Sequence, residues 1–393
     1  MAKLIDITGK ALSGEWGSDD ETGDGIPVLR TTNFTNEGVV NYNDVVTRLI
    51  TKKNIDEKYL RRGDIIIEKS GGSDKFPVGR VIYFDGDENT YLFNNFTGLL
   101  RVKNHEVWYP KYVFYSLFAN YKRGGTRTFE NKTTGLHNLK TDEFVSRYEV
   151  SEIGINEQIS ICNKLDKLFG IIKLREHELQ ILDDLIKAQF VEMFGDPRSN
   201  PYGFSKKQLK DTCKVVTGNT PSRSVEKYYG DYIEWIKTDN IVSGLLNPTK
   251  ASEKLSEEGM KVGRTVGKDS ILMACIAGSV TSIGRVCVTD RTVAFNQQIN
   301  AVVPVNYNIL FLYVLLQLSK EYLVGEINMA LKGILSKAKL EEKEFIVPPM
   351  ELQEQFADFV KQVDKTKVAL QRSLEKVQML FDSLMQNFFD KHE

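Results

Sequence analysis

The sequence is poor in the residues that usually carry catalysis or bind metals. Its 393 residues include only four cysteines and four histidines, and no two histidines are spaced as a metal-binding pair. The cysteines stand alone, without a C-x-x-C pair, so we expect no disulfide scaffold and a cytoplasmic location. No run reaches 18 apolar residues, and Asp6 interrupts the stretch that a signal peptide would need to be apolar. We therefore expect neither a membrane span nor a secretion signal.

Common catalytic motifs are also missing. There is no G-x-x-x-x-G-K-[ST] phosphate loop, no G-x-S-x-G nucleophile turn and no H-E-x-x-H metal motif. Residues 247–250 read Asn-Pro-Thr-Lys, which lacks the second proline and the aromatic residue of an amino-methyltransferase motif. Asp64 with Glu68 and Lys69 resembles a nuclease cluster, but the E-x-K spacing is absent. The sequence therefore predicts a chain without catalytic activity.

The charge is nearly balanced, with 52 basic and 53 acidic residues and a net charge of −1. Hydrophobic residues make up 41% of the chain and charged residues 27%, which is typical of a globular protein with real cores. A uniformly basic coat for nucleic acid is excluded, whereas a local basic face is not.

The chain contains an internal repeat. Five segments of the first half recur in the same order in the second half. Residues 28–33 match 235–240, 64–67 with 70–73 match 270–273 with 276–279, 78–81 match 283–286, 93–95 match 295–297, and 157–158 match 354–355. The offset stays near 200 residues, so the pattern indicates two tandem domains and not a solenoid.

Each copy has the same internal plan. Short β-rich runs at 64–69, 79–84, 270–275 and 283–288 are bounded by turn residues, and a helical stretch follows at 110–121 or 308–324. Each copy then ends in a polar, glycine-poor segment with helical spacing. We predict an α+β fold with four parts: globular domains at 1–150 and 198–347, and helical segments at 151–197 and 348–393.

The two closing segments carry apolar residues at alternating steps of three and four. This spacing is a seam of period 3.5, which is typical of a helix wound on a partner helix. The predicted seam residues are Leu165, Leu168, Ile172, Leu179, Leu182 and Ile186 in the first segment and Leu370, Leu374, Val377, Phe381 and Leu384 in the second.

Two interpretations of these helices are open: each could pack on its own domain, or the two could pair with each other. About 36 residues at about 1.5 Å each extend roughly 54 Å, which is longer than a small domain can cover. Length therefore favours pairing. Because the two copies would be related by a pseudo-twofold axis, we predict an antiparallel coiled coil.

Charge is distributed unevenly among the four parts. The helical segments are acidic, whereas residues 198–347 hold 20 basic and 15 acidic residues. Residues 1–150 balance at 21 and 21, yet 121–140 contain five basic residues and one acidic residue. This basic loop predicts a localised anion-binding face. The alternative is a solvated run of surface charge.

Several segments of the second copy resemble the specificity (S) subunit of type I restriction–modification enzymes. They are Thr-Gly-Asn-Thr-Pro-Ser at 217–222, Tyr-Gly at 229–230 leading into Ile-Glu-Trp-Ile-Lys-Thr-Asp-Asn-Ile at 233–241, Ile-Gly-Arg at 283–285, Phe-Asn-Gln-Gln at 295–298, and Val-Pro-Pro-Met-Glu-Leu-Gln-Glu-Gln at 347–355. The order of the parts extends the resemblance over the whole chain. The first copy departs from the pattern, because residues 9–16 lack Thr-Pro-Ser, residues 19–21 are acidic, and residues 150–153 lack the double proline.

The resemblance implies a non-catalytic, sequence-specific DNA-binding subunit. Each globular part would be a target recognition domain that reads one half of a bipartite, asymmetric site in double-stranded DNA. The coiled coil would set the spacing of the half-sites and dock two modification (methyltransferase) subunits. Restriction (translocase and nuclease) subunits would complete the complex. No cofactor is expected on this chain, whereas S-adenosylmethionine, ATP and Mg would bind to the partner subunits.

The candidate DNA-binding residues are hydrogen-bonding or basic side chains and small turn residues near the repeated motifs. In the first domain they are Arg30, Asn33, Ser70, Gly72, Ser73, Lys75, Arg123, Arg127 and Lys132. In the second they are Thr220, Ser222, Arg223, Lys237, Asn240, Gly278, Ser279, Lys332, Lys337 and Lys339. A turn or cap hydrogen bond is the alternative for Asn33 and Asn240, and a structural turn for the glycines. Arg80 and Arg285 are expected to stabilise the fold.

Two other functions are compatible with the same features. A coiled-coil adaptor with two ligand-binding heads and no DNA partner would explain the nearly neutral charge. A related type II restriction system that cuts on both sides of its site would use a recognition subunit of the same design.

Overall fold

The computed structural model describes residues 1–390 except 54, 134–135, 278, 280–281 and 326–332; the side chains of residues 132, 133 and 136 are also outside the described part. The chain forms two compact units. Unit 1 contains Met1–Lys173 with Glu375–Glu393, and unit 2 contains Leu174–Leu374. Each unit combines one globular head with one half of each of two long helices, and each is described separately below.

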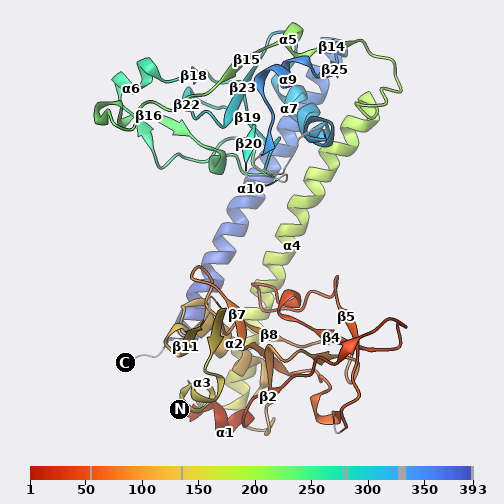
Figure 1. Cartoon of the computed structure of the whole chain (residues 1–393), viewed down its shortest axis with the longest axis vertical. Helices are drawn as coiled ribbons and strands as arrows, with labels where there is room; N and C mark the ends of the chain where they lie inside the picture. Colours follow the sequence, from red (N-terminus) through yellow and green to blue (C-terminus); the bar gives the residue numbers. More distant parts are fainter. Residues whose placement is uncertain (54, 134–135, 278, 280–281, 326–332, 391–393) are drawn as a thin grey trace. The chain divides into compact units, whose positions relative to one another are not determined.

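The head of unit 1, called head 1, extends from β1 to β13 and is built from small sheets (Figure 1). Two four-stranded sheets have the orders β2-β10-β6-β8 and β3-β5-β4-β9, and smaller sheets pair β11-β12-β7 and β1-β13. The strands are β1 (Ala2–Lys3), β2 (Leu12–Ser13), β3 (Ser18–Asp19), β4 (Ile26–Leu29), β5 (Val46–Leu49), β6 (Ile65–Glu68), β7 (Ser70–Gly72), β8 (Val81–Tyr83), β9 (Leu92–Phe93), β10 (Thr97–Leu100), β11 (Glu130–Thr133), β12 (Leu136–Leu139) and β13 (Glu149–Val150). The helices are α1 (Leu4–Thr8), η1 (Thr31–Asn33), η2 (Asp56–Lys58), α2 (Pro110–Lys122), η3 (Arg127–Phe129) and α3 (Thr141–Arg147).

The head of unit 2, called head 2, extends from β14 to β25 and repeats this plan. Its sheets have the orders β15-β23-β19-β21, β17-β16-β22-β18, β20-β24 and β14-β25. The strands are β14 (Lys206–Gln208), β15 (Cys213–Thr217), β16 (Tyr229–Ile236), β17 (Lys254–Leu255), β18 (Thr265–Val266), β19 (Ile271–Ala274), β20 (Ile276–Ala277), β21 (Val286–Val288), β22 (Val293–Phe295), β23 (Ile299–Pro304), β24 (Gly333–Ile334) and β25 (Glu344–Ile346). The helices are α5 (Leu209–Thr212), η4 (Glu226–Tyr228), η5 (Thr238–Asn240), α6 (Glu257–Val262), α7 (Ile309–Leu318), α8 (Lys320–Val324) and α9 (Lys337–Glu342).

The internal repeat is confirmed strand by strand. The predicted β-runs contain β6, β8, β19 and β21. Strand β6 lies between β10 and β8, and the equivalent strand β19 lies between β23 and β21, with all four pairs antiparallel. Each head also contains one parallel pair, β4 with β9 and β16 with β22. The residues of β6 and β19 are all buried, because their sheets are covered on both faces and favour continuous apolar runs.

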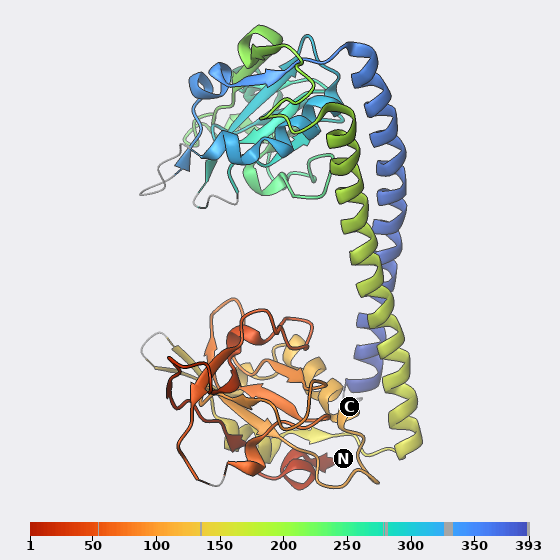
Figure 2. The ribbon, with the colours of Figure 1, turned by 90° about the vertical axis from the view of Figure 1, so that its right-hand side faces the viewer.

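The long helices α4 (Ile155–Phe194) and α10 (Met350–Phe389) lie side by side and antiparallel in each unit (Figures 1 and 2). In unit 1 the rings of Phe169 and Phe381 are 6.5 Å apart, and Lys164 lies 5.9 Å from the ring of Phe388. In unit 2 Lys367 donates to Asp183, and the rings of Phe190 and Phe356 are 5.4 Å apart. Since residue numbers fall along α10 as they rise along α4, the predicted antiparallel pairing is confirmed.

The predicted seam residues lie on the packed side of both helices. Leu165, Ile172 and Phe381 are buried, and the other predicted seam positions are partly buried. In unit 2 the ends of the helices also enter the core of head 2, where Phe190, Phe194 and Phe356 pack on Phe311. Helix α4 ends at Gly195, whose φ of +72° is the left-handed conformation that glycine adopts at helix ends.

A buried glutamine begins each long helix. Gln158 donates to the carbonyls of Val107 and Ile153 and accepts from the N–H of Tyr109, each at 2.9 Å. Gln353 donates to Pro348 at 2.8 Å and accepts from the N–H of Asn308 at 2.9 Å. Tyr109 and Asn308 are the N-cap residues of α2 and α7.

The structural equivalent of Gln158 is therefore Gln353. The sequence match of residues 157–158 with 354–355 is wrong by two positions at the glutamine, because Gln355 is exposed on α10. The physical reason is that the buried amide must stand in the first turn of the helix, where it reaches the N-cap of the head helix.

Candidate nucleic-acid interface

The turns that follow β4 and β16 are held by buried asparagines. The side-chain oxygen of Asn33 accepts from the N–H of Arg30 at 2.8 Å, and that of Asn240 accepts from the N–H of Lys237 at 3.0 Å. The amide group of Asn33 donates to the carbonyls of Asn41 and Asp44. Both asparagines are buried, so the structure shows the cap hydrogen bond of the alternative interpretation and leaves no exposed amide for a base.

Arg80 and Arg285 stabilise these same turns, as the sequence predicted. Arg80 donates to the carbonyls of Thr31 and Phe34 at 2.9 and 2.8 Å. Arg285 donates to the carbonyl of Thr238 at 3.1 Å. Each arginine therefore ties the start of β8 or β21 to the turn that carries Arg30 or Lys237.

Two candidate cations of head 2 share one carboxylate. Arg223 donates to Glu253 at 2.6 Å, and Lys237 donates to the other oxygen of Glu253. Hydrogen bonding by Lys237 and Arg223 lowers the pKa of Glu253 despite partial desolvation. Arg223 also lies 5.2 Å from the ring of Trp235, as does Lys237. This Trp235 cluster brings two predicted residues together over an aromatic face, with one net positive charge.

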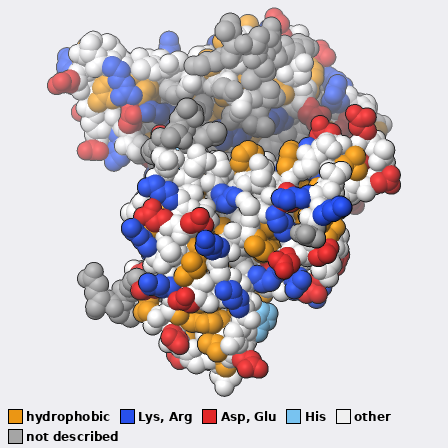
Figure 3. All heavy atoms as spheres, turned by 60° about the horizontal axis from the view of Figure 1, so that its bottom comes forward, with side chains coloured by type: hydrophobic (Ala, Val, Ile, Leu, Met, Phe, Trp, Pro, Cys, Tyr) orange, Lys and Arg blue, Asp and Glu red, His pale blue; other side chains and the backbone are white. Residues whose placement is uncertain are grey.

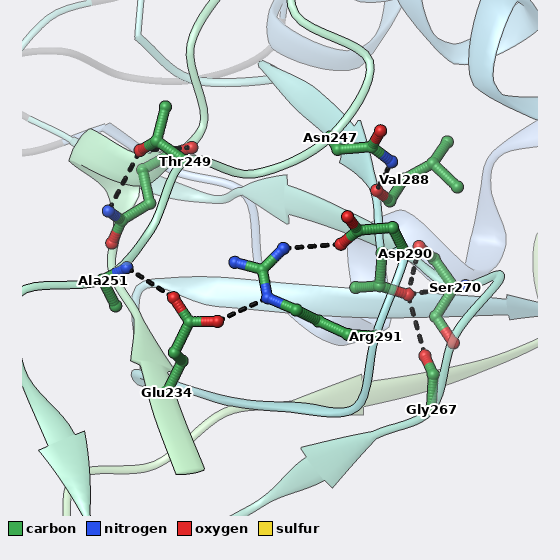
Figure 4. Close-up of polar contacts among 11 residues, drawn as sticks. Glu234, Asn247, Thr249, Ala251, Gly267, Ser270, Val288, Asp290 and Arg291 are labelled. Carbon is green, nitrogen blue, oxygen red and sulfur yellow. Dashed lines mark hydrogen bonds and ion pairs between the residues drawn. The ribbon is translucent and has the colours of Figure 1, made fainter. Parts of the chain in front are cut away.

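A polar network supports this cluster from β16 (Figure 4). Arg291 donates to Glu234 and, at 2.5 Å, to Asp290, and the other oxygen of Glu234 accepts from the N–H of Ala251 at 2.8 Å. Hydrogen bonding by Arg291 lowers the pKa of Glu234. Thr249, close to Ala251, accepts from Asn240 at 3.2 Å, so the network also fixes the turn behind Lys237.

The opening loop of head 2 places Thr220, Ser222 and Arg223 on the surface. Thr220 donates to Gln297, and the hydroxyl groups of Ser222 and Ser224 are 2.8 Å apart. Gly218 is required where the loop starts, because a Cβ atom there would lie 2.1 Å from the carbonyl oxygen of Asn296. The loop therefore runs directly over the turn that follows β22.

Head 1 has the same glycine but a different opening loop. A Cβ atom at Gly14 would lie 2.2 Å from the carbonyl oxygens of Phe93 and Asn94. The next residue, Glu15, accepts from Lys52 at 2.7 Å and from Lys58, and these bonds lower its pKa. The predicted contact residue Arg30 donates to the carboxylate of Asp44 at 2.8 Å. Its guanidinium is thus already paired on the surface of head 1.

Four predicted residues of head 1 meet at the loop between β7 and β8. Gly72 and Ser73 begin this loop, Lys75 is exposed on it, and Arg127 donates to the carbonyl of Asp74 at 3.2 Å. Ser70 stands two residues before Gly72, at the start of β7 and opposite Asn138 of β12. This β7–β8 loop brings residues from two distant parts of the sequence into one place.

Arg123 lies away from the β7–β8 loop and contacts the end of α10. It forms an ion pair with Asp390, and its second nitrogen donates to the carbonyl of Phe389 at 3.3 Å. The ring of Phe389 also packs 5.2 Å from that of Tyr112 on α2. Arg123 therefore fixes the last turn of α10 on head 1, and its guanidinium is occupied there.

The remaining predicted residues of head 2 are less constrained. Ser279 is exposed beside Ser282, with their hydroxyl groups 3.0 Å apart. Lys337 and Lys339 are exposed on α9, and Lys337 pairs with Glu341 at 3.6 Å. Gly278, Lys332 and the side chain of Lys132 lie outside the described residues.

The described residues contain no group of three or more His, Cys, Asp or Glu that could hold a metal ion. The carboxylates that resembled a nuclease cluster are bound to arginines, Asp64 to Arg101 at 2.6 Å and Glu68 to Arg80 at 3.3 Å. The face in Figure 3 carries basic and acidic side chains interspersed. Among the described helices none is long and apolar enough to cross a membrane.

The long helices also carry exposed apolar side chains that were not among the predicted residues. In unit 2 those at least 44% exposed are Leu174, Ile181, Leu185 and Val191 on α4 and Val368 on α10. Leu174, Ile181 and Leu185 recur at steps of seven and four, so these three form an exposed apolar stripe separate from the buried seam. The sequence carried this signal, because a helix that packs on one partner helix needs only one apolar seam, whereas α4 has a second apolar stripe.

Matches to known proteins also divide the chain into two similar parts. Residues 2–183 and 201–378 each match the family model of the type I restriction modification DNA specificity domain. A stretch of 106 residues is 31% identical to the specificity subunit of the type I restriction enzyme HindI of Haemophilus influenzae. That match covers 26% of this chain and 22% of the relative's length.

Two solved structures share the fold over nearly the whole chain. The S subunit of a type I restriction–modification system from M. genitalium aligns with a TM-score of 0.61 at 15% identity, covering 100% of this chain and 96% of that one. A chain from a structure concerned with complex assembly and conformational transition of a type I R-M system aligns with a TM-score of 0.53 at 16% identity, covering 99% and 96%.

Proposed function

Because this chain belongs to the type I restriction–modification DNA specificity family, we propose that it is the sequence-recognition subunit of such a system. Each head would read one half of a bipartite, asymmetric site in double-stranded DNA. One observation carries this proposal: the family model matches twice, and each match contains one of the two structurally equivalent heads. Since the two heads differ in their surface residues, the two half-sites would differ in sequence.

The proposed DNA contacts are the predicted residues that remain exposed. In head 1 these are Ser73, Lys75 and Arg127, and in head 2 they are Thr220, Ser222, Arg223, Ser279, Lys337 and Lys339. Lys237 joins them through the Trp235 cluster. Phosphate oxygens would compete with Glu253 for Arg223 and Lys237. The two side chains would then leave Glu253 and bind the DNA backbone. Arg30, Asn33, Arg123 and Asn240 would act by supporting the fold.

We further propose that the exposed apolar stripe of α4 docks modification subunits. Leu174, Ile181 and Leu185 are 54%, 50% and 44% exposed, and an unpartnered stripe of this kind is typical of a binding surface. Two modification subunits would bring S-adenosylmethionine and the methyl-transfer chemistry. Restriction subunits would add ATP- and Mg-dependent cleavage. This chain would hold none of these cofactors and would work in the cytoplasm.

Methylome sequencing tests the recognition proposal. A host lacking endogenous adenine and cytosine methylation would express this chain with its modification subunit, and the modification subunit alone would serve as the control. We expect one modified motif made of two unlike half-sites separated by a fixed gap. An unmodified genome, or a single contiguous motif, would contradict the proposal.

Co-purification tests the docking surface. Replacing Ile181 and Leu185 together by serine should abolish co-purification with the modification subunit and leave the melting temperature nearly unchanged, because both side chains are exposed. Gln180→Ser, at an exposed polar neighbour, is the matched control. Normal co-purification of the double variant would show that the subunit binds elsewhere.

A further inference from the structure

The β7–β8 loop of head 1 presents an aromatic ring to solvent. Phe76 is 51% exposed, although phenylalanine is normally a core residue. The ammonium group of Lys75 lies 5.3 Å from the centre of the Phe76 ring. A single exposed apolar residue does not by itself indicate a binding site. The contacts that fix the loop around Phe76 are therefore described next.

Hydrogen bonds within the loop close its tip. The N–H of Ser73 donates to the carbonyl of Phe76 at 2.6 Å, and the N–H of Phe76 donates to the hydroxyl oxygen of Ser73 at 3.1 Å. Arg127 donates to the carbonyl of Asp74 at 3.2 Å from the segment that follows α2. These bonds fix the backbone on both sides of Phe76.

The base of the loop is held by buried side chains of the β11–β12 hairpin. The N–H of Val78 donates to Glu130 at 2.9 Å, and the other oxygen of Glu130 lies 3.2 Å from Nδ1 of His137. The side chains of Glu130 and His137 are only 4% and 8% exposed. At Gly72 a Cβ atom would lie 2.4 Å from the nitrogen of Val78, so the two ends of the loop touch through their backbones.

These hydrogen bonds fix the backbone that carries Phe76, while its ring lies outside the core of head 1. A phenylalanine that contributed to folding would be buried, whereas the ring of Phe76 is half exposed beside the ammonium group of Lys75. Arg127 binds the backbone carbonyls of Asp74 and Lys75, and the exposed carboxylate of Asp74 offsets one of the two positive charges on this loop. A cation beside an apolar ring suits a polyanion that also offers apolar surface. Duplex DNA does so through thymine methyl groups and the faces of base pairs.

We propose that Phe76 is a base-contacting, specificity-determining residue of head 1, and that Lys75 and Arg127 contact the flanking phosphates. This inference rests on the proposed function. The equivalent position in head 2 follows β20, where residues 276–285 contain no aromatic side chain. The apolar contact would therefore belong to one half-site only.

Fluorescence anisotropy on the assembled complex of this chain with its modification subunit tests the inference. The probe is a duplex that carries the motif returned by methylome sequencing. Phe76→Ala should weaken binding about tenfold and leave the salt dependence unchanged, because the ring carries no charge. Lys75→Ala should instead flatten the salt dependence. Tyr202→Ala, which removes another exposed ring, is the matched control and should bind as the wild type does.

Two further probes define the contact. If the ring touches a thymine methyl group, one thymine-to-uracil substitution in the half-site will weaken the wild type and not Phe76→Ala. If it opens a base step, 2-aminopurine at that step will brighten with the wild type only. Wild-type affinity of Phe76→Ala, or a loss explained by a lower melting temperature, would overturn the inference. A wild-type complex that modifies no bipartite motif would instead refute the proposed function.

Discussion

Gln158 and Gln353 play equivalent parts in the two units, because each accepts from the N-cap N–H of a head helix and donates to the carbonyl five residues before it. Both side chains are almost fully buried. Gln353→Leu would leave the N–H of Asn308 and the carbonyl of Pro348 without these partners. We expect the free energy of unfolding to fall by about 2–3 kcal/mol, measured by urea denaturation. The matched control is Gln355→Leu at an exposed position, with an expected change within about 0.5 kcal/mol. Equal effects of the two substitutions would contradict this role.

The ion pair of Arg123 with Asp390 predicts a local effect on α10. Arg123→Ala should accelerate hydrogen exchange in the last turn of α10, because Phe389 loses a donor to its carbonyl. The pair is partly exposed, so the loss of stability should be at most about 1 kcal/mol. Arg147→Ala, which removes a more exposed pair with Glu143, should leave exchange in α10 unchanged. The salt dependence of DNA binding should also stay unchanged in Arg123→Ala.

Glu253 predicts a gain of DNA affinity on mutation. Glu253→Gln would free Arg223 and Lys237 from their shared carboxylate, so the complex should bind duplex DNA more tightly. The plot of log K against log salt should become steeper by about one unit for each added phosphate contact. Glu258→Gln, which frees Lys227 from a surface pair, controls for the change in net charge. A similar gain in both variants would assign the effect to overall charge.

Asp364 on α10 predicts a pH-dependent stability. Burial raises its pKa above the ordinary value of 3.8, and the charge of Lys367 opposes this shift only in part. The folded state thus binds the proton more tightly than the unfolded state, so this group lowers stability as pH rises above about 4. Asp364→Asn should raise the melting temperature at neutral pH and lose that advantage below pH 4. Asp358→Asn, at an exposed residue paired with Lys361, should show no such gain.

The four cysteines predict slow reaction with thiol reagents. Cys162, Cys213, Cys275 and Cys287 are all buried and reduced, and burial raises the pKa of each thiol to about 12. Labelling of the folded chain by a disulfide reagent should therefore follow the rate of unfolding. A Ser383→Cys variant supplies an exposed thiol on α10 and should be labelled at once. Fast labelling of the native cysteines would contradict their burial.

The sequence predicted the parts of the fold that depend on local periodicity. The spacing of Leu165 and Ile172 predicted a buried seam, and the recurrence of Gly-Arg at 79–80 and 284–285 predicted two equivalent strands; both are confirmed. The glutamine match was wrong by two positions, because the second copy offers both Gln353 and Gln355 and only burial shows which of them is equivalent to Gln158. Local sequence similarity does not show which glutamine reaches the N-cap of the head helix.

The individual contacts were harder to predict, because the same residue types cap turns and bind bases. Asn33 and Asn240 differ from a base-reading asparagine only in burial, which depends on contacts distant in sequence. Arg123 was assigned to a basic loop, yet its partner Asp390 stands 267 positions later. Part of the Trp235 cluster was predicted: Lys237 was named as a DNA contact, whereas nothing near Glu253 in the sequence indicated that it pairs with Lys237.

The short strands at the borders of the heads have an evolutionary consequence. Strand β1 pairs with β13, and β14 pairs with β25, so the chain enters and leaves each head at neighbouring positions. A segment inserted between such paired borders can differ in length and sequence without altering the residues that flank it. Exchange of the segment between two paired borders, by one crossover at each border, would replace one head and create a new combination of half-sites, while both long helices stay those of the parent.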